Sequence, residues 1–183
     1  LGTELPDFAL PEPRTGRIVA AADFAGKKAL LVMFICNHCP YVQHVRHGLA
    51  DLGRDYEDGA LGIVAISSND VAEYPSDGPE AIAAEVAAMD YRFPYLYDEA
   101  QEVAKAFGAI CTPDFFLYGP KRTLLYRGRM DDARPNMPAQ VTGADLRAAI
   151  EAVLHDRAVP AEQLPSMGCS IKWRPGNAPG HAS

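Results

Sequence analysis

A continuous apolar run of seven residues, 29–35, is the feature that most constrains the fold of this chain. A run of this length without polar alternation is typical of a strand that is covered on both faces of a sheet. From Val42 to Tyr56 the apolar residues then recur at steps of three and four, which predicts an amphipathic helix. Pro40 suits the first turn of that helix, where its missing N–H group has no partner to lose. The sequence therefore predicts a buried strand followed at once by a helix.

The rest of the chain extends this unit into an α/β fold. We expect, in order, an N-terminal β-hairpin in residues 5–26, a strand in 61–67, a helical insertion in 69–89, a short strand in 95–97, a helix ending at Gly108, antiparallel strands in 115–118 and 123–129, and a last helix from Thr142. Helices between and after the strands imply a central sheet with helices on both faces. The predicted fold class is a three-layer α/β/α sandwich with an N-terminal β-hairpin, a central helical insertion and an irregular C-terminal tail.

Length, composition and charge exclude several other classes. A chain of 183 residues most simply forms one domain, which we place in residues 1–155. Residues 156–183 contain four prolines and three glycines and predict an irregular tail packed on that domain. The net charge of −7, without a basic block, argues against a nucleic-acid partner. No apolar run approaches the ~18 residues of a membrane span, so none is expected in this chain.

The first residues lack a basic segment followed by an apolar stretch, which is the pattern of a secretory signal peptide. We therefore expect a cytoplasmic protein, or a periplasmic one if an upstream signal has been removed, and a monomer or weak dimer. Four cysteines are too few for a disulfide-stapled scaffold. Their uneven placement, as a close pair and two single residues, indicates redox or metal chemistry.

The close pair lies between the predicted strand and helix, in the segment Cys-Asn-His-Cys-Pro of residues 36–40. Two thiols separated by two residues beside a βα pattern are typical of dithiol–disulfide exchange. A helix N-terminus stabilises a thiolate through its unpaired N–H groups and its dipole. We expect Cys36 to be the exposed attacking sulfur and Cys39 to be the more shielded, resolving thiol. His38 either stabilises the thiolate, which makes the disulfide more oxidising, or is an exposed residue without a tuning role.

Thr112-Pro113 precedes a strong strand in the second half of the chain. One interpretation is a cis-proline loop that packs on the dithiol and leaves a backbone edge for pairing with a substrate chain. The other is a proline that simply opens a strand.

Two further cysteines leave alternatives open. Cys111 is either a buried, inert thiol or an accessory redox group near the active end of the sheet. Cys169 lies in the tail, four residues before the only tryptophan. It either packs as a buried group or reaches the dithiol, in which case the tail is a lid and the site holds a relay of three thiols.

Metal binding is the main alternative chemistry. Cys36 and Cys39, with His44 and His47, resemble a zinc tetrad in spacing. On one continuous helix, a rise of ~1.5 Å per residue separates Cys39 from His47 by ~12 Å. Ligands at ~2 Å from one metal do not span that distance, so the spacing disfavours structural zinc. A looser copper or zinc site stays open, as does a binding module that has kept the fold without its chemistry.

Four segments together resemble the thioredoxin-fold redoxin class, the group that includes peroxiredoxin-like proteins and thiol–disulfide isomerases and thioredoxins. They are residues 23–27 (Asp-Phe-x-Gly-Lys), 34–42 around the dithiol, 112–116 (Thr-Pro-Asp-Phe-Phe) and 168–173 (Gly-Cys-Ser-Ile-Lys-Trp). The resemblance covers almost the whole chain and implies a thioredoxin-like sandwich. It also implies that Cys36 is the nucleophile, Cys39 the resolving cysteine and Pro113 a cis-proline. No cofactor is implied beyond the redox-active disulfide, and no metal.

The chain departs from these relatives at several positions. Peroxiredoxins carry Pro-x-x-x-Thr-x-x-Cys, whereas this chain has Ala29 and Met33 at the proline and threonine positions. Thioredoxin has a tryptophan before its first cysteine and a carboxylate in the preceding strand, whereas this chain has Ile35 and an apolar strand. The proton acceptor for the resolving cysteine must then come from elsewhere. Asp70, Glu73 and Asp114 are candidates, and the alternative for each is a surface carboxylate without that role.

The sequence therefore predicts a thiol–disulfide oxidoreductase with an antioxidant type of activity. Its Cys36–Cys39 dithiol would exchange with a protein or small-thiol substrate or reductant through a mixed disulfide. The alternatives are a peroxiredoxin-like thiol peroxidase and a Cys/His copper- or zinc-binding protein on the same fold.

Overall fold

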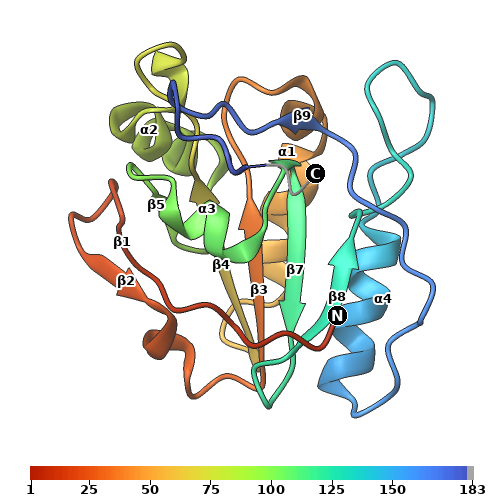
Figure 1. Cartoon of the computed structure of the whole chain (residues 1–183). Helices are drawn as coiled ribbons and strands as arrows, with labels where there is room; N and C mark the ends of the chain where they lie inside the picture. Colours follow the sequence, from red (N-terminus) through yellow and green to blue (C-terminus); the bar gives the residue numbers. More distant parts are fainter. Residues whose placement is uncertain (181–183) are drawn as a thin grey trace.

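The structure, a computed structural model, describes residues 1–180 and is built on one five-stranded mixed sheet (Figure 1). The strand order is β5-β4-β3-β7-β8. Their bounds are β3 Ala29–Phe34, β4 Leu61–Ser67, β5 Tyr95–Tyr97, β7 Asp114–Tyr118 and β8 Leu124–Gly128. Strand β3 pairs parallel with β4 on one side and antiparallel with β7 on the other. The strand predicted from the apolar run is therefore the central strand of the sheet.

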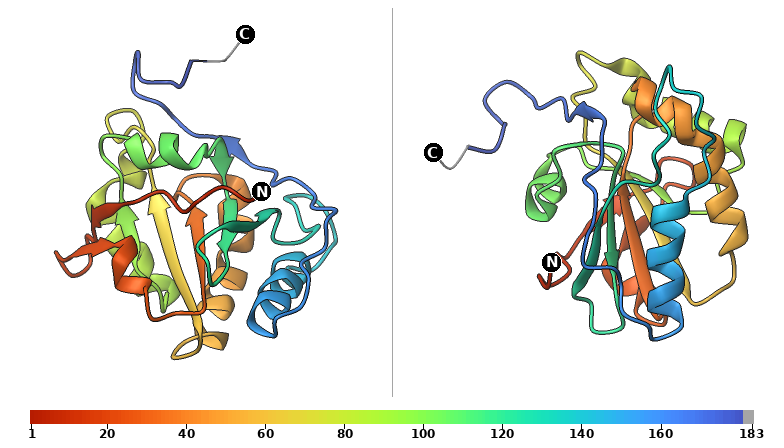
Figure 2. Two further views of the ribbon diagram at one scale, coloured as in Figure 1. Left: turned by 60° about the horizontal axis from the view of Figure 1, so that its bottom comes forward. Right: turned by 90° about the vertical axis from the view of Figure 1, so that its right-hand side faces the viewer.

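Helices cover both faces of this sheet, as the sequence predicts (Figures 1 and 2). The first face packs against the helices α1 (Pro40–Asp55), α2 (Pro79–Met89) and α4 (Ala144–Leu154). The second face packs against α3 (Glu102–Phe107) and the hairpin segment that contains β1 (Ala9–Pro11) and β2 (Ile18–Ala20). Because side chains alternate along β3, Leu31 and Met33 enter the first core and Leu30 and Val32 the second. The three-layer α/β/α sandwich is thus confirmed.

Several short elements lie between these parts. They are the 3₁₀ turns η1 (Ala21–Phe24) and η2 (Pro75–Asp77) and the two-residue strands β6 (Cys111–Thr112) and β9 (Cys169–Ser170). The helical insertion between β4 and β5 consists of η2 and α2, as expected. Within residues 1–180, no helix is long and apolar enough to cross a lipid bilayer.

The C-terminal segment is largely irregular, as its composition predicts, but it contains one short strand. Its strand β9 pairs antiparallel with β6 and forms a second small sheet at the end of the molecule that carries the dithiol (Figure 1). The next residue, Ile171, is 3% exposed and joins the second core. Strand pairing and this buried side chain therefore fix the middle of the tail.

Leu49 offers a test of the core on the first face. Its side chain is fully buried on α1, so Leu49→Ala removes buried apolar surface and leaves a cavity. We expect the free energy of unfolding to fall by about 2–5 kcal/mol in urea denaturation followed by circular dichroism. The same change at Leu1, which is 67% exposed, should cost less than about 0.5 kcal/mol. Equal effects of the two substitutions would contradict the packing described.

Candidate active site

The dithiol lies at the carboxyl end of β3, where the chain enters α1. Cys39 is the N-cap residue of that helix and Pro40 is its first residue. Both cysteines are buried, at 1% and 0% exposure for Cys36 and Cys39. The prediction of an exposed Cys36 sulfur is therefore wrong. The physical reason is that Thr112 and the tail strand β9 cover this end of the sheet.

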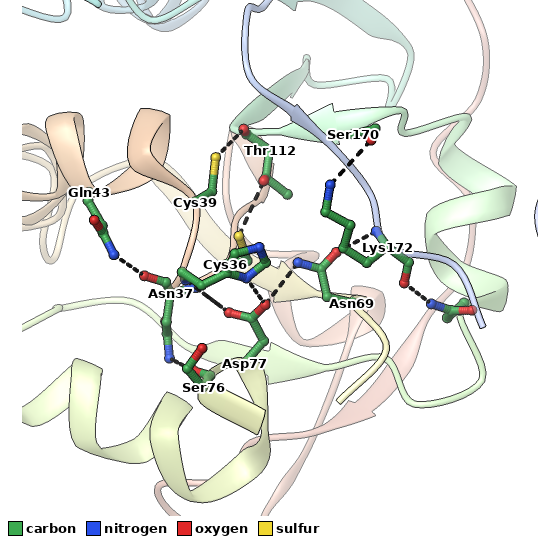
Figure 3. A network of polar contacts seen from close by, with 12 residues as sticks. Cys36, Asn37, Cys39, Gln43, Asn69, Ser76, Asp77, Thr112, Ser170 and Lys172 are labelled. Carbon is green, nitrogen blue, oxygen red and sulfur yellow. Dashed lines mark hydrogen bonds and ion pairs between the residues drawn. The ribbon is translucent and has the colours of Figure 1, made fainter. Parts of the chain in front are cut away.

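Thr112 contacts both sulfurs (Figure 3). Its hydroxyl oxygen lies 3.3 Å from Cys36 Sγ, and its carbonyl oxygen lies 3.4 Å from Cys39 Sγ, where it accepts a hydrogen bond when Cys39 is protonated. The peptide bond between Thr112 and Pro113 is cis. The structure therefore brings the second sequence motif against the first, as the cis-proline interpretation predicts.

The backbone edge at this loop is already occupied. Strand β6, which ends at Thr112, pairs with β9 so that Thr112 lies opposite Cys169. The cis-proline interpretation predicts an open edge for a substrate chain, whereas in the structure the protein's own tail takes that place.

A buried carboxylate that the sequence analysis did not select fixes the loop between the two cysteines. Asp77, at 0% exposure, accepts hydrogen bonds from the backbone amides of Asn37 at 2.7 Å and His38 at 3.1 Å (Figure 3). Its second oxygen accepts from the Asn69 side chain at 3.0 Å and pairs with His38 Nδ1. Hydrogen bonds to an ionised acceptor are about twice as strong as neutral ones. Asp77 therefore holds the loop in place from the helical insertion.

His38 takes part in this network and is not a free surface residue. Its ring stacks on Tyr74 with a centroid distance of 4.5 Å. The ligand atoms of Cys36, His38 and Asp77 all lie within 4.8 Å of one another. The ring is therefore close enough to the Cys36 sulfur to influence its charge.

The three carboxylates expected as proton acceptors have other partners. Asp70 accepts from the amide of Ala72 at 3.1 Å, and Glu73 is exposed. Asp114 pairs with Arg127 at 3.2 Å, and burial raises the pKa of its carboxyl. The carboxylate that lies beside Cys36 is Asp77. The polar residues Ser68-Asn69-Asp70 were a useful signal. They directly follow β4, the neighbour of the dithiol strand, and Asn69 donates a hydrogen bond to Asp77 there.

The two sulfurs of the dithiol titrate as one pair. The hydrogen bond with the Cys36 thiol lowers the pKa of Cys39 to about 4, against the opposing effect of burial. The same hydrogen bond, then burial and the Asp77 carboxylate, raises the pKa of Cys36. The sequence placed the thiolate at Cys36, and the nearby carboxylate is a reason why it rests on Cys39 at the helix N-terminus.

The other two cysteines differ from each other. Cys111 is buried and its thiol donates to the carbonyl of Pro113 at 3.7 Å. Burial, and then the Asp114 carboxylate, raises the pKa of Cys111 to about 12, which favours the inert interpretation. Cys169 is partly exposed and packs against the core cluster that contains Cys36 and Cys39.

Within residues 1–180, the group of side chains that could hold a metal is Cys36, His38 and Asp77. Both oxygens of Asp77 already accept hydrogen bonds, so an ion would have to displace the groups that donate these bonds. The tetrad suggested by the sequence is not assembled in this part of the chain, since His44 and His47 do not join the group. The geometry therefore fits a thiol site better than a metal centre.

A pH titration of the reduced protein tests the shared proton. Thiolates absorb in the short-wavelength ultraviolet more strongly than thiols, and one thiolate should be present at neutral pH and disappear as the pH falls through about 4. Cys39→Ser should remove this transition. Cys111→Ser should keep it, because the pKa of Cys111 is about 12 and its thiol contributes no charge there. A transition near the ordinary cysteine pKa instead would contradict the coupling.

The chain is similar to several known proteins. Residues 1–127 match the model of the AhpC/TSA family. A hypothetical protein from Sinorhizobium meliloti is 51% identical, with a TM-score of 0.94 over 96% of each chain. An uncharacterized conserved protein from Geobacillus kaustophilus is 49% identical, with a TM-score of 0.94 over 96% of this chain and 93% of its own.

A putative thioredoxin from Neisseria meningitidis is 24% identical, with a TM-score of 0.64 over 85% of this chain and 91% of its own, and shows the thioredoxin-like fold. No curated protein matches the chain. The family match covers more than half of the residues, including the dithiol and Pro113. The chain therefore belongs to the AhpC/TSA family.

Proposed function

We propose that this protein is a thiol–disulfide oxidoreductase that uses its Cys36–Cys39 pair. The observation that carries the proposal is the placement of two thiols between a helix N-terminus and the Thr112-Pro113 loop. A stabilised thiolate is the reactive form in exchange, and a second thiol beside it resolves the mixed disulfide. The names of more distant neighbours, such as the putative thioredoxin, agree with this chemistry.

The reaction exchanges two electrons between sulfur atoms. A thiolate of the pair attacks a substrate disulfide, and one substrate sulfur leaves as a thiol. The partner cysteine then attacks the mixed disulfide, which closes the Cys36–Cys39 bond and releases the second substrate thiol. The opposite direction oxidises two substrate thiols by the same steps.

Neighbouring polar groups serve this exchange without joining it covalently. The Thr112 hydroxyl can donate to a Cys36 thiolate, because the two atoms are 3.3 Å apart. The Asp77 carboxylate disfavours charge on Cys36, and the His38 ring pairs with that carboxylate. These residues therefore bias which sulfur carries the charge and with it the redox potential of the pair.

Substitution of Cys39 by serine tests the proposed function. Cys39→Ser should lower dithiothreitol-dependent reduction of a protein disulfide, such as insulin, by about a hundredfold or more, because no disulfide can form with Cys36. Cys111→Ser is the matched control and should leave the rate unchanged. Wild-type protein that fails to accelerate the reaction, or full activity in the Cys39 variant, would refute the proposal.

Peroxide turnover distinguishes this function from a thiol peroxidase. Met33 stands where a peroxiredoxin has its threonine, and its fully buried side chain offers no hydroxyl to orient a peroxide. We therefore expect consumption of hydrogen peroxide, with dithiothreitol as reductant, close to that of the Cys39→Ser variant. Rapid consumption that depends on Cys39 would favour the peroxidase instead.

A further inference from the structure

The tail strand β9 is a part of the site that the proposed function does not use. It pairs with β6 so that Cys169 lies directly opposite Thr112. Side chains of directly opposed residues project from the same face of an antiparallel pair. The Thr112 hydroxyl contacts Cys36, so this face is turned toward the dithiol. Cys169 accordingly packs against the core cluster that contains both sulfurs of the pair, and three thiols share one site.

The backbone on either side of Cys169 is fixed. A Cβ atom added to Gly168 would lie 1.9 Å from the carbonyl oxygen of Thr112, so only glycine permits this close approach. Beyond the strand, the amide of Lys172 donates to Asn69 Oδ1 at 2.9 Å (Figure 3). The carbonyl of Lys172 accepts from Gln101 Nε2 at 2.9 Å. Cys169 is therefore held at the dithiol from both sides.

Access differs among the three sulfurs. Cys36 and Cys39 are buried, whereas Cys169 is partly exposed. Cys169 is therefore the most exposed cysteine of the three, and the rate of exchange with an external thiol depends on such access. A substrate peptide, in contrast, finds the edge of β6 already paired.

We propose that Cys169 is a third redox thiol. It replaces Cys36 as the disulfide partner of Cys39 and then exchanges with small external thiols. This inference rests on the proposed function, because it requires that the Cys36–Cys39 disulfide forms. It assigns a role to the tail and narrows the reductant to small thiols that reach a partly exposed sulfur.

Each step exchanges one bond for another. The Cys169 thiol loses its proton and attacks Cys39, the Cys39–Cys169 bond forms, and Cys36 leaves and takes up a proton. An external thiolate then attacks Cys169, which forms a mixed disulfide and releases Cys39 as a thiolate. A second external thiol attacks the mixed disulfide, so that Cys169 is restored and the small thiol leaves as its disulfide. The net result is the reduced Cys36–Cys39 pair and one oxidised pair of external thiols.

The charges at the site favour the second exchange, in which Cys39 is the leaving group, over the first, in which Cys36 leaves beside Asp77 and takes up a proton. A leaving thiol of low pKa departs faster, and the pKa of Cys39 is lowered to about 4. Burial, and then the hydrogen bond with Cys39, raises the pKa of Cys169 to about 11 in the dithiol form. The second of these causes weakens when the Cys39 sulfur is in a disulfide and carries no charge. Lys172 acts in the opposite direction and favours a thiolate at Cys169.

Trapping and kinetics test the proposal. Oxidation of the Cys36→Ser variant with diamide should give a Cys39–Cys169 disulfide, identified by mass spectrometry of the digested, alkylated protein. Oxidised Cys169→Ser should retain the Cys36–Cys39 bond but react with reduced glutathione about tenfold or more slowly than wild type. Cys111→Ser is the matched control and should behave as wild type.

Gly168→Ala provides a second variant that retains Cys169. Its methyl group cannot be placed beside Thr112, so β9 should shift and the reaction with glutathione should slow in the same way. Rates in the Cys169 and Gly168 variants equal to or above wild type would overturn the inference, because β9 would then be only a cover. Absence of the Cys39–Cys169 bond in Cys36→Ser would also overturn it. Failure of wild type to form a Cys36–Cys39 disulfide would instead refute the proposed function.

Discussion

The antiparallel pairing of β3 with β7 determines where the chemistry of this protein lies. Phe34 of β3 is paired with Asp114 of β7. The residue two positions after Phe34 is Cys36, and it therefore faces Thr112, two positions before Asp114. The first sulfur and the Thr112 hydroxyl are therefore brought together by the register of the central sheet. A slip of one residue would turn the alternating side chains of β3 to the opposite cores. The apolar packing on both faces of β3 thus also fixes the geometry of the site.

Charge at the site depends on a second long-range contact. The Asp77 carboxylate comes from the insertion between β4 and β5, is buried, and binds the amides that precede α1. These amides would otherwise favour a negative charge near Cys36 through the helix dipole. Since Asp77 already supplies one, a second negative charge is better placed on Cys39. The insertion therefore changes which thiol of a familiar motif is ionised.

The sequence predicted those parts of the molecule that depend on local pattern. The apolar run, the helical spacing after Pro40 and the short connection between residues 115–118 and 123–129 predicted the sheet and the helices that cover it. The position of the dithiol and of Pro113 followed from the same reasoning. The burial of Cys36, the role of Asp77 and the pairing of Cys169 did not follow, because each depends on segments distant in sequence. A two-residue strand such as β9 has no periodicity to detect, and its pairing depends on Gly168 meeting Thr112.

Energetics favour a tail that stays in place while sulfur bonds are exchanged beneath it. Lifting β9 would expose the Ile171 side chain, which is worth about 1.5–3 kcal/mol. It would also break the backbone hydrogen bonds from Ile171 to Ile110 and from Asp70 to Lys172, at about 0.5–1.5 kcal/mol each. A cost of several kcal/mol leaves a lifted state at or below about 1% of the molecules. Exchange through a sulfur that is already partly exposed avoids this penalty, so the three-thiol arrangement explains how a buried dithiol can react.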